Sequence, residues 1–137
     1  MKSQVLSLRL KQEQMERLQR LARRADRKPS ELAARLIEEA LRAAEFPEIE
    51  FRDSVLGRQA YIKGHRLTVW MLAWLASKYD YDLANTAEHL GWPTWLVEAG
   101  LTYYHAFAPE IDPFIVEHEA SDLETLRRVL PNVEVSR

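Results

Sequence analysis

Apolar and polar residues alternate at the start of the chain. If residues 3–10 are extended, one face is entirely apolar and consists of Leu6, Leu8 and Leu10. The opposite face is mostly polar and consists of Val5, Ser7 and Arg9. Because side chains alternate between the two faces of a strand, this pattern predicts a β-strand with one face to bury.

A helical period follows the strand. Residues 12–25 predict an amphipathic helix with an apolar stripe formed by Met15, Leu18, Leu21, Ala22 and Ala25. After a break at residues 26–29, Pro29 suits the first turn of a second helix, where its missing N–H costs nothing. We predict this second helix over about residues 30–45, and it ends before Pro47.

One strand and two helices of this size cannot bury a core of their own. A single unpaired strand also exposes its backbone hydrogen-bonding groups. Both difficulties disappear if two chains pair their strands antiparallel and interlock their helices. We therefore expect residues 1–46 to form an obligate dimer, whose stability depends on protein concentration.

The middle of the chain predicts short strands and then helices. Residues 48–67 have the pattern of short strands, with a turn at Lys63-Gly64. Thr68 is a suitable N-cap for a helix over residues 69–78, which is apolar on nearly all sides and should be buried. Asp82 is a suitable cap for a helix over residues 83–90.

A helix-turn-helix pattern continues this region. Gly91 marks a tight break before a helix predicted over residues 94–107. Ala87, Gly91 and Val97 have the spacing of a helix-turn-helix, although such a triad is common by chance. We interpret the aromatic residues here as core residues rather than as a ligand cage: Trp70, Trp74, Trp92, Trp95, Tyr103 and Tyr104.

The last part of the chain is amphipathic and acidic. Two prolines predict a connector at residues 108–113, and a helical segment follows at residues 114–119. Ser121 and Glu124 have capping-box spacing for a further short helix with the apolar face Leu123, Leu126 and Leu130. Val133 and Val135 alternate as in a strand. Either the tail wraps a partner protein, or it packs back on the preceding domain.

Charge is distributed unevenly along the chain. The formal net charge of −2 divides into +4 for residues 1–45, −2 for residues 46–107 and −4 for residues 108–137. A basic head and an acidic tail indicate two different partners. The absence of cysteine, of a membrane-length apolar stretch and of a signal peptide leads us to expect a cytoplasmic protein with no membrane contact.

The sequence does not indicate catalytic chemistry. Its four histidines are scattered without metal-ligand spacing. There is no glycine-rich phosphate loop and no nucleophile elbow. We therefore expect no enzyme activity, no cofactor and no metal site.

About a third of the chain resembles the ribbon-helix-helix repressors of the Arc, MetJ and CopG type. The matching features are the alternating strand, the arginine-rich first helix and Lys28-Pro29-Ser30 at the start of the second. The resemblance implies that paired strands enter the major groove, where outward side chains read bases: Val5, Ser7 and Arg9. It also implies phosphate contacts from Lys28 and Ser30. Lys11 stands where many relatives have proline and adds a candidate phosphate contact.

A second resemblance covers about residues 48–112. The stretches 57–70, 87–92 and 99–104 are similar to small winged helix-turn-helix domains known as VapB-type antitoxins. His65 stands where many of those relatives have threonine. The resemblance implies an antitoxin that is partnered with a PIN-type ribonuclease toxin.

Charge argues against DNA reading by this helix-turn-helix. There is no Lys or Arg between Lys78 and Arg127, although affinity for DNA comes largely from these residues. We expect the motif to serve protein contact or dimer packing. Four cations of the hairpin region remain candidates for contacts with the DNA backbone: Arg52, Arg58, Lys63 and Arg66.

These patterns predict a mainly α protein with a ribbon-helix-helix dimer domain at residues 1–46. A winged helix-turn-helix-like domain with a β-hairpin follows at residues 47–109, and an acidic tail at residues 110–137. The leading hypothesis is a repressor and antitoxin that binds double-stranded operator DNA as a homodimer or higher even oligomer. The alternative is a stand-alone regulator whose second domain mediates oligomerisation. A third hypothesis is a structural protein whose ribbon only dimerises.

Overall fold

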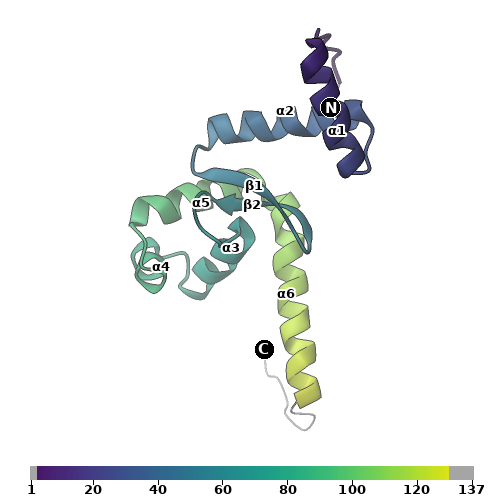
Figure 1. Cartoon of the computed structure of the whole chain (residues 1–137). Coiled ribbons are helices and arrows are strands. Elements are labelled where there is room, and N and C mark those ends of the chain that lie inside the picture. The colour runs from purple at the N-terminus through teal and green to yellow at the C-terminus, as the bar shows by residue number, and fades with distance from the viewer. Residues whose placement is uncertain (1–2, 130–137) are drawn as a thin grey trace. The chain divides into compact units, whose positions relative to one another are not determined.

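The computed structural model describes residues 3–129, and these form two compact units that divide after Ala44 (Figure 1). The structure is mainly helical, with one small antiparallel hairpin, as the sequence predicts. No helix among residues 3–129 is both long enough and apolar enough to cross a membrane. The predicted strand at Val133 and Val135, and Leu130 of the predicted last helix, lie outside the described residues.

The first unit contains two helices joined by a tight turn. Helix α1 spans Gln12–Arg24 and α2 spans Pro29–Glu45, each within one residue of its predicted bounds. Asp26 adopts a φ of 52° in the turn between them, a conformation that Asp tolerates better than most residues. Residues 3–11 have no regular secondary structure in the single chain. The ribbon needs two chains, so it stays a prediction.

The second unit begins with the hairpin. Strand β1 spans Ile49–Ser54 and pairs antiparallel with β2, Gly57–Ile62, in a register that places Ile49 opposite Ile62. Gly57 accommodates the turn with a φ of 104°. The predicted turn at Gly64 is confirmed by its φ of 79°, and an isolated bridge then joins Tyr61 to Thr68.

Three helices follow within the predicted region: α3, Val69–Lys78; α4, Leu83–Leu90; and α5, Thr94–Ala106. Both predicted caps are confirmed. Thr68 Oγ1 accepts a hydrogen bond from the Met71 N–H at 3.3 Å, and an Asp82 carboxylate oxygen accepts one from the Asn85 N–H at 2.9 Å. Gly91 ends α4 in the left-handed conformation, with a φ of 68°.

The prediction of a connector and two short helices after residue 107 is wrong. A single helix, α6, spans Ala108–Val129 and contains Pro113 in its interior. Pro109 lies in the first turn, where proline is tolerated, so only Pro113 removes a donor from the helix. Ser121 therefore lies within the helix and caps no new one. Packing of Ile111 in the core, where it is 6% exposed, offsets the cost of the proline.

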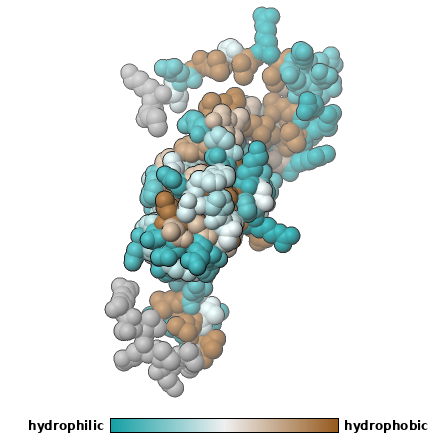
Figure 2. All heavy atoms as spheres, turned by 90° about the vertical axis from the view of Figure 1, so that its left-hand side faces the viewer, coloured by the Kyte–Doolittle hydropathy of each residue, from teal (hydrophilic) through white to brown (hydrophobic). Residues whose placement is uncertain are grey.

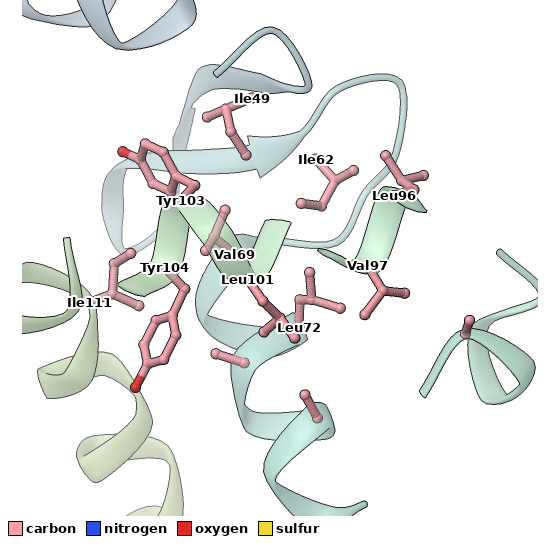
Figure 3. Close-up of a cluster of buried hydrophobic side chains, with 13 residues drawn as sticks. Ile49, Ile62, Val69, Leu72, Leu96, Val97, Leu101, Tyr103, Tyr104 and Ile111 are labelled. Carbon is pink, nitrogen blue, oxygen red and sulfur yellow. The ribbon is translucent and has the colours of Figure 1, made fainter. Parts of the chain in front are cut away.

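The core of the second unit joins the hairpin to its helices (Figure 3). Ile49 and Ile62 of the two strands belong to the same cluster as Val69 and Leu72 of α3 and Val97 of α5. The predicted burial of α3 is confirmed on the side that carries Leu72, Ala73 and Ala76. Figure 3 shows that Tyr104 and Ile111 extend this cluster toward α6.

The aromatic residues do not all belong to the core. Tyr103 is completely buried and Tyr104 is 9% exposed, as predicted. Trp70, Trp74 and Trp92 are only half-buried. The prediction is wrong for Trp95, which is 58% exposed because it lies across α5 from the buried Leu96 and Val97.

Candidate nucleic-acid interface

The predicted base-reading residues lie on an exposed extended segment. Val5 is 96% exposed, and Ser7 and Arg9 are exposed as well. Arg9 makes no hydrogen bond or ion pair with any residue in the described part of the chain. Its guanidinium group is therefore available to an external acceptor.

The apolar face of the same segment borders a groove. Leu6, Leu8 and Leu10 line a groove of about 700 Å³ together with apolar side chains of α1 and α2, including Leu18 and Leu36. Leu6 and Leu8 are 76% and 64% exposed, which is unusual for leucines of a folded unit. Hydrophobic side chains near the top of Figure 2 belong to this unit. Among the residues described in the first unit, only Ala22 and Leu32 are buried.

The start of α2 carries the predicted phosphate-binding residues. The backbone oxygen of Lys28 accepts the first hydrogen bond of the helix, from the Leu32 N–H at 3.0 Å. Ser30, in the first turn, is exposed and lies where helical N–H groups have no partner within the helix. Lys28 also lines a polar depression of about 460 Å³.

Sequence reasoning did not single out two further cations of that depression. Arg23 and Arg27 line it beside Lys28, and Asp26 and Glu31 line it as well. The arginines are brought together by the turn, in which the Arg27 N–H bonds the Ala22 oxygen at 2.9 Å. No spacing rule in the sequence places residue 23 beside residue 27 across a turn of this shape.

Lys11 has a local structural role in addition to its predicted one. It is the N-cap residue of α1, and its backbone N–H donates a hydrogen bond to Gln14 Oε1 at 3.0 Å. Proline at this position could not donate this bond. The side chain of Lys11 is exposed and remains a candidate phosphate contact.

The four hairpin cations do not form one patch along the strand, and Arg52 is engaged in bonds within the hairpin. Arg58 lies at the start of β2, where it forms an ion pair with Asp53 at 3.5 Å. Lys63 and Arg66 lie after the far end of β2, and both are exposed. The structure therefore brings Lys63 and Arg66 near each other in one loop and leaves Arg58 at the opposite end of the strand.

Arg52 is engaged within the hairpin. Its guanidinium group bonds the Glu50 carboxylate, donates to the His65 backbone oxygen at 2.6 Å and lies 4.4 Å from the Tyr61 ring centroid. The Gly64 N–H also donates to Glu50, at 3.1 Å. This backbone hydrogen bond, followed by that from Arg52, holds the pKa of Glu50 below its usual value. The cluster ties β1 to the loop at residues 63–67.

Helices α4 and α5, which the sequence predicts to form a helix-turn-helix, carry no Lys or Arg. Ala87 and Val97 are buried on either side of the Gly91 turn, as the motif requires. The exposed side of α5 carries Trp95, Glu98, Thr102 and His105. No Lys or Arg lies anywhere from residue 79 to residue 126. A surface of this composition would repel the phosphates on both sides of a major groove.

Helix α6 packs on the second unit with its first half. Phe114 and His118 contact the Trp70 ring, with centroid distances of 6.5 and 5.3 Å, and Glu119 lies 3.8 Å from the Lys78 amine. Beyond residue 119, Leu126 and Val129 are 40% and 69% exposed, whereas Leu123 is half-buried. Residues 108–119 thus pack back on the rest of the second unit, and residues 120–129 are available to contact a partner.

Residues 3–129 contain no group of three His, Asp or Glu side chains that could hold a metal ion. No family model matches the chain, and neither a curated protein nor a solved structure shows significant similarity to it. The two resemblances therefore rest on the motifs quoted above.

Proposed function

We propose that the chain is a DNA-binding transcription regulator whose first unit dimerises and reads operator DNA through paired strands. The observation that carries this proposal is the segment over residues 3–10. Its leucines border an apolar groove, while Val5, Ser7 and Arg9 do not line it. One segment thus presents a face to bury and a face to read with.

A second copy of the chain is the occupant that best fits the groove. Two copies can cover each other's leucines and satisfy the backbone groups of both strands in one step. A unit with two buried side chains gains little stability alone, so folding and pairing of this unit should be coupled. Its net charge of +4, for residues 1–45, supports binding to phosphates.

Dimerisation is tested by substituting Leu8→Ser, which places a hydroxyl on the face to be buried. We expect the wild-type chain to sediment as a dimer or higher even oligomer and the variant to shift toward monomer. Val5→Ser, on the opposite face, is the matched control and should leave the oligomeric state unchanged. Equal sedimentation of all three proteins would contradict strand pairing.

Base reading is tested by selecting bound duplexes from a random DNA library and measuring affinity for the selected and a scrambled site. Arg9→Ala should weaken binding to the selected site by about 5- to 150-fold, the range for a lost bidentate guanine contact. Arg42→Ala removes the same charge from an arginine that is paired with Glu38 at 2.9 Å. It should weaken both sites alike and slightly. If the two variants behaved identically, Arg9 would not read bases.

We further propose that the regulator is an antitoxin and that its acidic C-terminal half binds a basic ribonuclease toxin. The resemblance to VapB-type antitoxins supports this, as do the bare end of α6 and the charge of −4 over residues 108–137. Purification of the chain from its native operon, with mass measurement of the complex, is the test. A complex that contains a second, basic protein is expected. A complex of this chain alone would favour the stand-alone regulator, with the second unit in an oligomer contact.

A structural protein that only dimerises is the remaining alternative. It predicts a stable dimer with no preference for any selected duplex. The library selection described above separates it from both regulator hypotheses, because it would return no enriched sequence.

A further inference from the structure

A cavity of about 330 Å³ lies within the second unit. Its walls come from the hairpin, α3 and α6, and Figure 1 shows the start of α6 beside the hairpin. The volume is at the lower end of the range for small-molecule sites. Neither the proposed DNA binding nor the proposed toxin binding uses this cavity.

One wall of the cavity contains the side-chain amide of Gln59, whose N–H₂ group has no partner among the described residues. Gln59 is 6% exposed, and its Oε1 accepts a hydrogen bond from Trp70 Nε1 at 3.1 Å. Its N–H₂ group makes no hydrogen bond with any residue in the described part of the chain. Among the described residues, the fully enclosed side-chain polar atoms without a partner are Arg35 Nε and Trp74 Nε1, so the Gln59 donor is open to the cavity, where water or a ligand can accept from it.

The other walls are largely aromatic. Phe51, Trp70 and Phe114 all line the cavity. The rings of Trp70 and Phe114 are nearly parallel, with an angle of 16° between their planes and 6.5 Å between their centroids. Planar rings are favourable neighbours for such faces because offset stacking adds to the burial of apolar area.

The charged side chains that line the cavity do not call for a charged ligand. Arg58, which lines it, pairs with Asp53 at 3.5 Å, and Glu110, which also lines it, has an interaction partner as well. Arg58 therefore needs no counter-charge from a ligand, and Glu110 is exposed to solvent. A charged ligand would lose its hydration without a dedicated partner, so the chemistry favours a neutral molecule.

From these observations we propose that the cavity is a binding site for a neutral, planar aromatic molecule with a carbonyl or ring-nitrogen acceptor on its edge. The ring lies against Trp70, Phe51 and Phe114, and the acceptor takes a hydrogen bond from the Gln59 N–H₂ group. Such a ligand touches the hairpin, α3 and α6 at once, so it holds the first half of α6 against the hairpin.

The test uses acetophenone and its isostere α-methylstyrene, in which a CH₂ group replaces the carbonyl oxygen. Each is titrated to about 1 mM into the full-length, ¹⁵N-labelled protein. We expect acetophenone to bind with a Kd on the order of 1 mM, which is ordinary for so small a ligand. It should shift the Gln59 side-chain amide protons downfield, whereas α-methylstyrene should not.

Two variants distinguish the contribution of the Gln59 amide to binding from that of the cavity volume. Gln59→Glu keeps an oxygen for Trp70 but removes the donor, so it should weaken acetophenone by about 3- to 10-fold and leave α-methylstyrene unchanged. Ala60→Leu fills part of the cavity, since Ala60 lines it, and should weaken both compounds. The amide spectrum of each variant checks that the fold is intact, and Gln59→Met replaces Gln59→Glu if it is not.

Several results would overturn the proposal. One is that neither compound perturbs residues of the second unit at 1 mM. Another is that shifts centre on the leucine groove of the first unit, which would mean that aromatic compounds merely find the larger apolar surface. The third is an equal affinity of the two compounds that Gln59→Glu does not change. Shifts of Gln59 and Trp70 that depend on the carbonyl support the site.

Discussion

Helix α5 passes α3 so closely at Gly100 that a single added methyl group should be costly. A Cβ atom at this position would lie 2.3 Å from Leu72 Cδ2 and 2.9 Å from Ile62 Cδ1. Leu72 and Ile62 are both completely buried, so neither side chain can move into solvent to make room. Gly100→Ala therefore overpacks the contact that holds the helix-turn-helix to the hairpin.

The expected loss of stability is opposite in sign to what helix propensity alone predicts for Gly100→Ala. Alanine in a helix interior is more stable than glycine by about 1 kcal/mol. Inserting a methyl group into a well-packed core costs about 1–3 kcal/mol, and the separations here are far below contact distance. We expect the steric term to win and Gly100→Ala to lower the free energy of unfolding by about 1–3 kcal/mol.

Urea denaturation followed by tryptophan fluorescence measures this loss. All four tryptophans lie between residues 70 and 95, so the signal reports the second unit and not dissociation of the first. Thr102→Ala, on the exposed side of the same helix, is the control and should change stability by only a few tenths of a kcal/mol. A Gly100→Ala protein as stable as the wild type, or more so, would refute the packing described here.

Three further predictions concern the second unit. Burial, and then the 2.5 Å hydrogen bond to Asp112, raises the pKa of Tyr104. The stability that the protonated Tyr104 contributes is therefore present below pH 10 and is lost as the pH rises. Tyr104→Phe should flatten this alkaline loss and lower the free energy of unfolding at neutral pH by about 1.5 kcal/mol, as measured by urea titration. The pKa of Glu50 is lowered from its usual value of 4.5, so the ionised carboxylate contributes stability above pH 4.5 that is lost as the pH falls. Glu50→Gln should make the thermal stability less dependent on pH on the acid side. Gly91→Ala should cost about 1 kcal/mol in the same urea assay and Gly91→Asn less, because φ is 68° and no atom crowds the site.

Local sequence patterns fixed most element boundaries in the second unit. Thr68 and Asp82 bond the helix ends for which their side chains are suited, and Gly91 adopts the conformation that other residues avoid. These signals act within four residues of one another, so they can be recognised without knowing the fold. The continuous α6 was missed because its prolines are local signals as well, and only packing of Ile111 and its neighbours outweighs them.

The candidate site residues likewise divide into those that local patterns predict and those that depend on the fold. Strand alternation was enough to separate the face of Leu6, Leu8 and Leu10 from that of Val5, Ser7 and Arg9, because the period of a strand is a local property. The commitment of Arg52 to Glu50 and His65 could not be predicted, since it depends on a turn that returns the chain to β1. Nothing in the sequence distinguishes Arg52 from Arg66, which remains exposed.

The sequence by itself determined the amphipathic pattern of the first segment, the helices before residue 107 with the caps at Thr68 and Asp82, and the acid and base distribution of the chain. Tertiary structure alone decided that Gln59 is buried beside three aromatic rings from the hairpin, α3 and α6, and that Gly100 meets Leu72. The physical reason is the separation along the chain of the residues that interact. Periodicity and capping are set by neighbours along the chain, whereas burial, cavities and steric contacts depend on side chains brought together from distant positions.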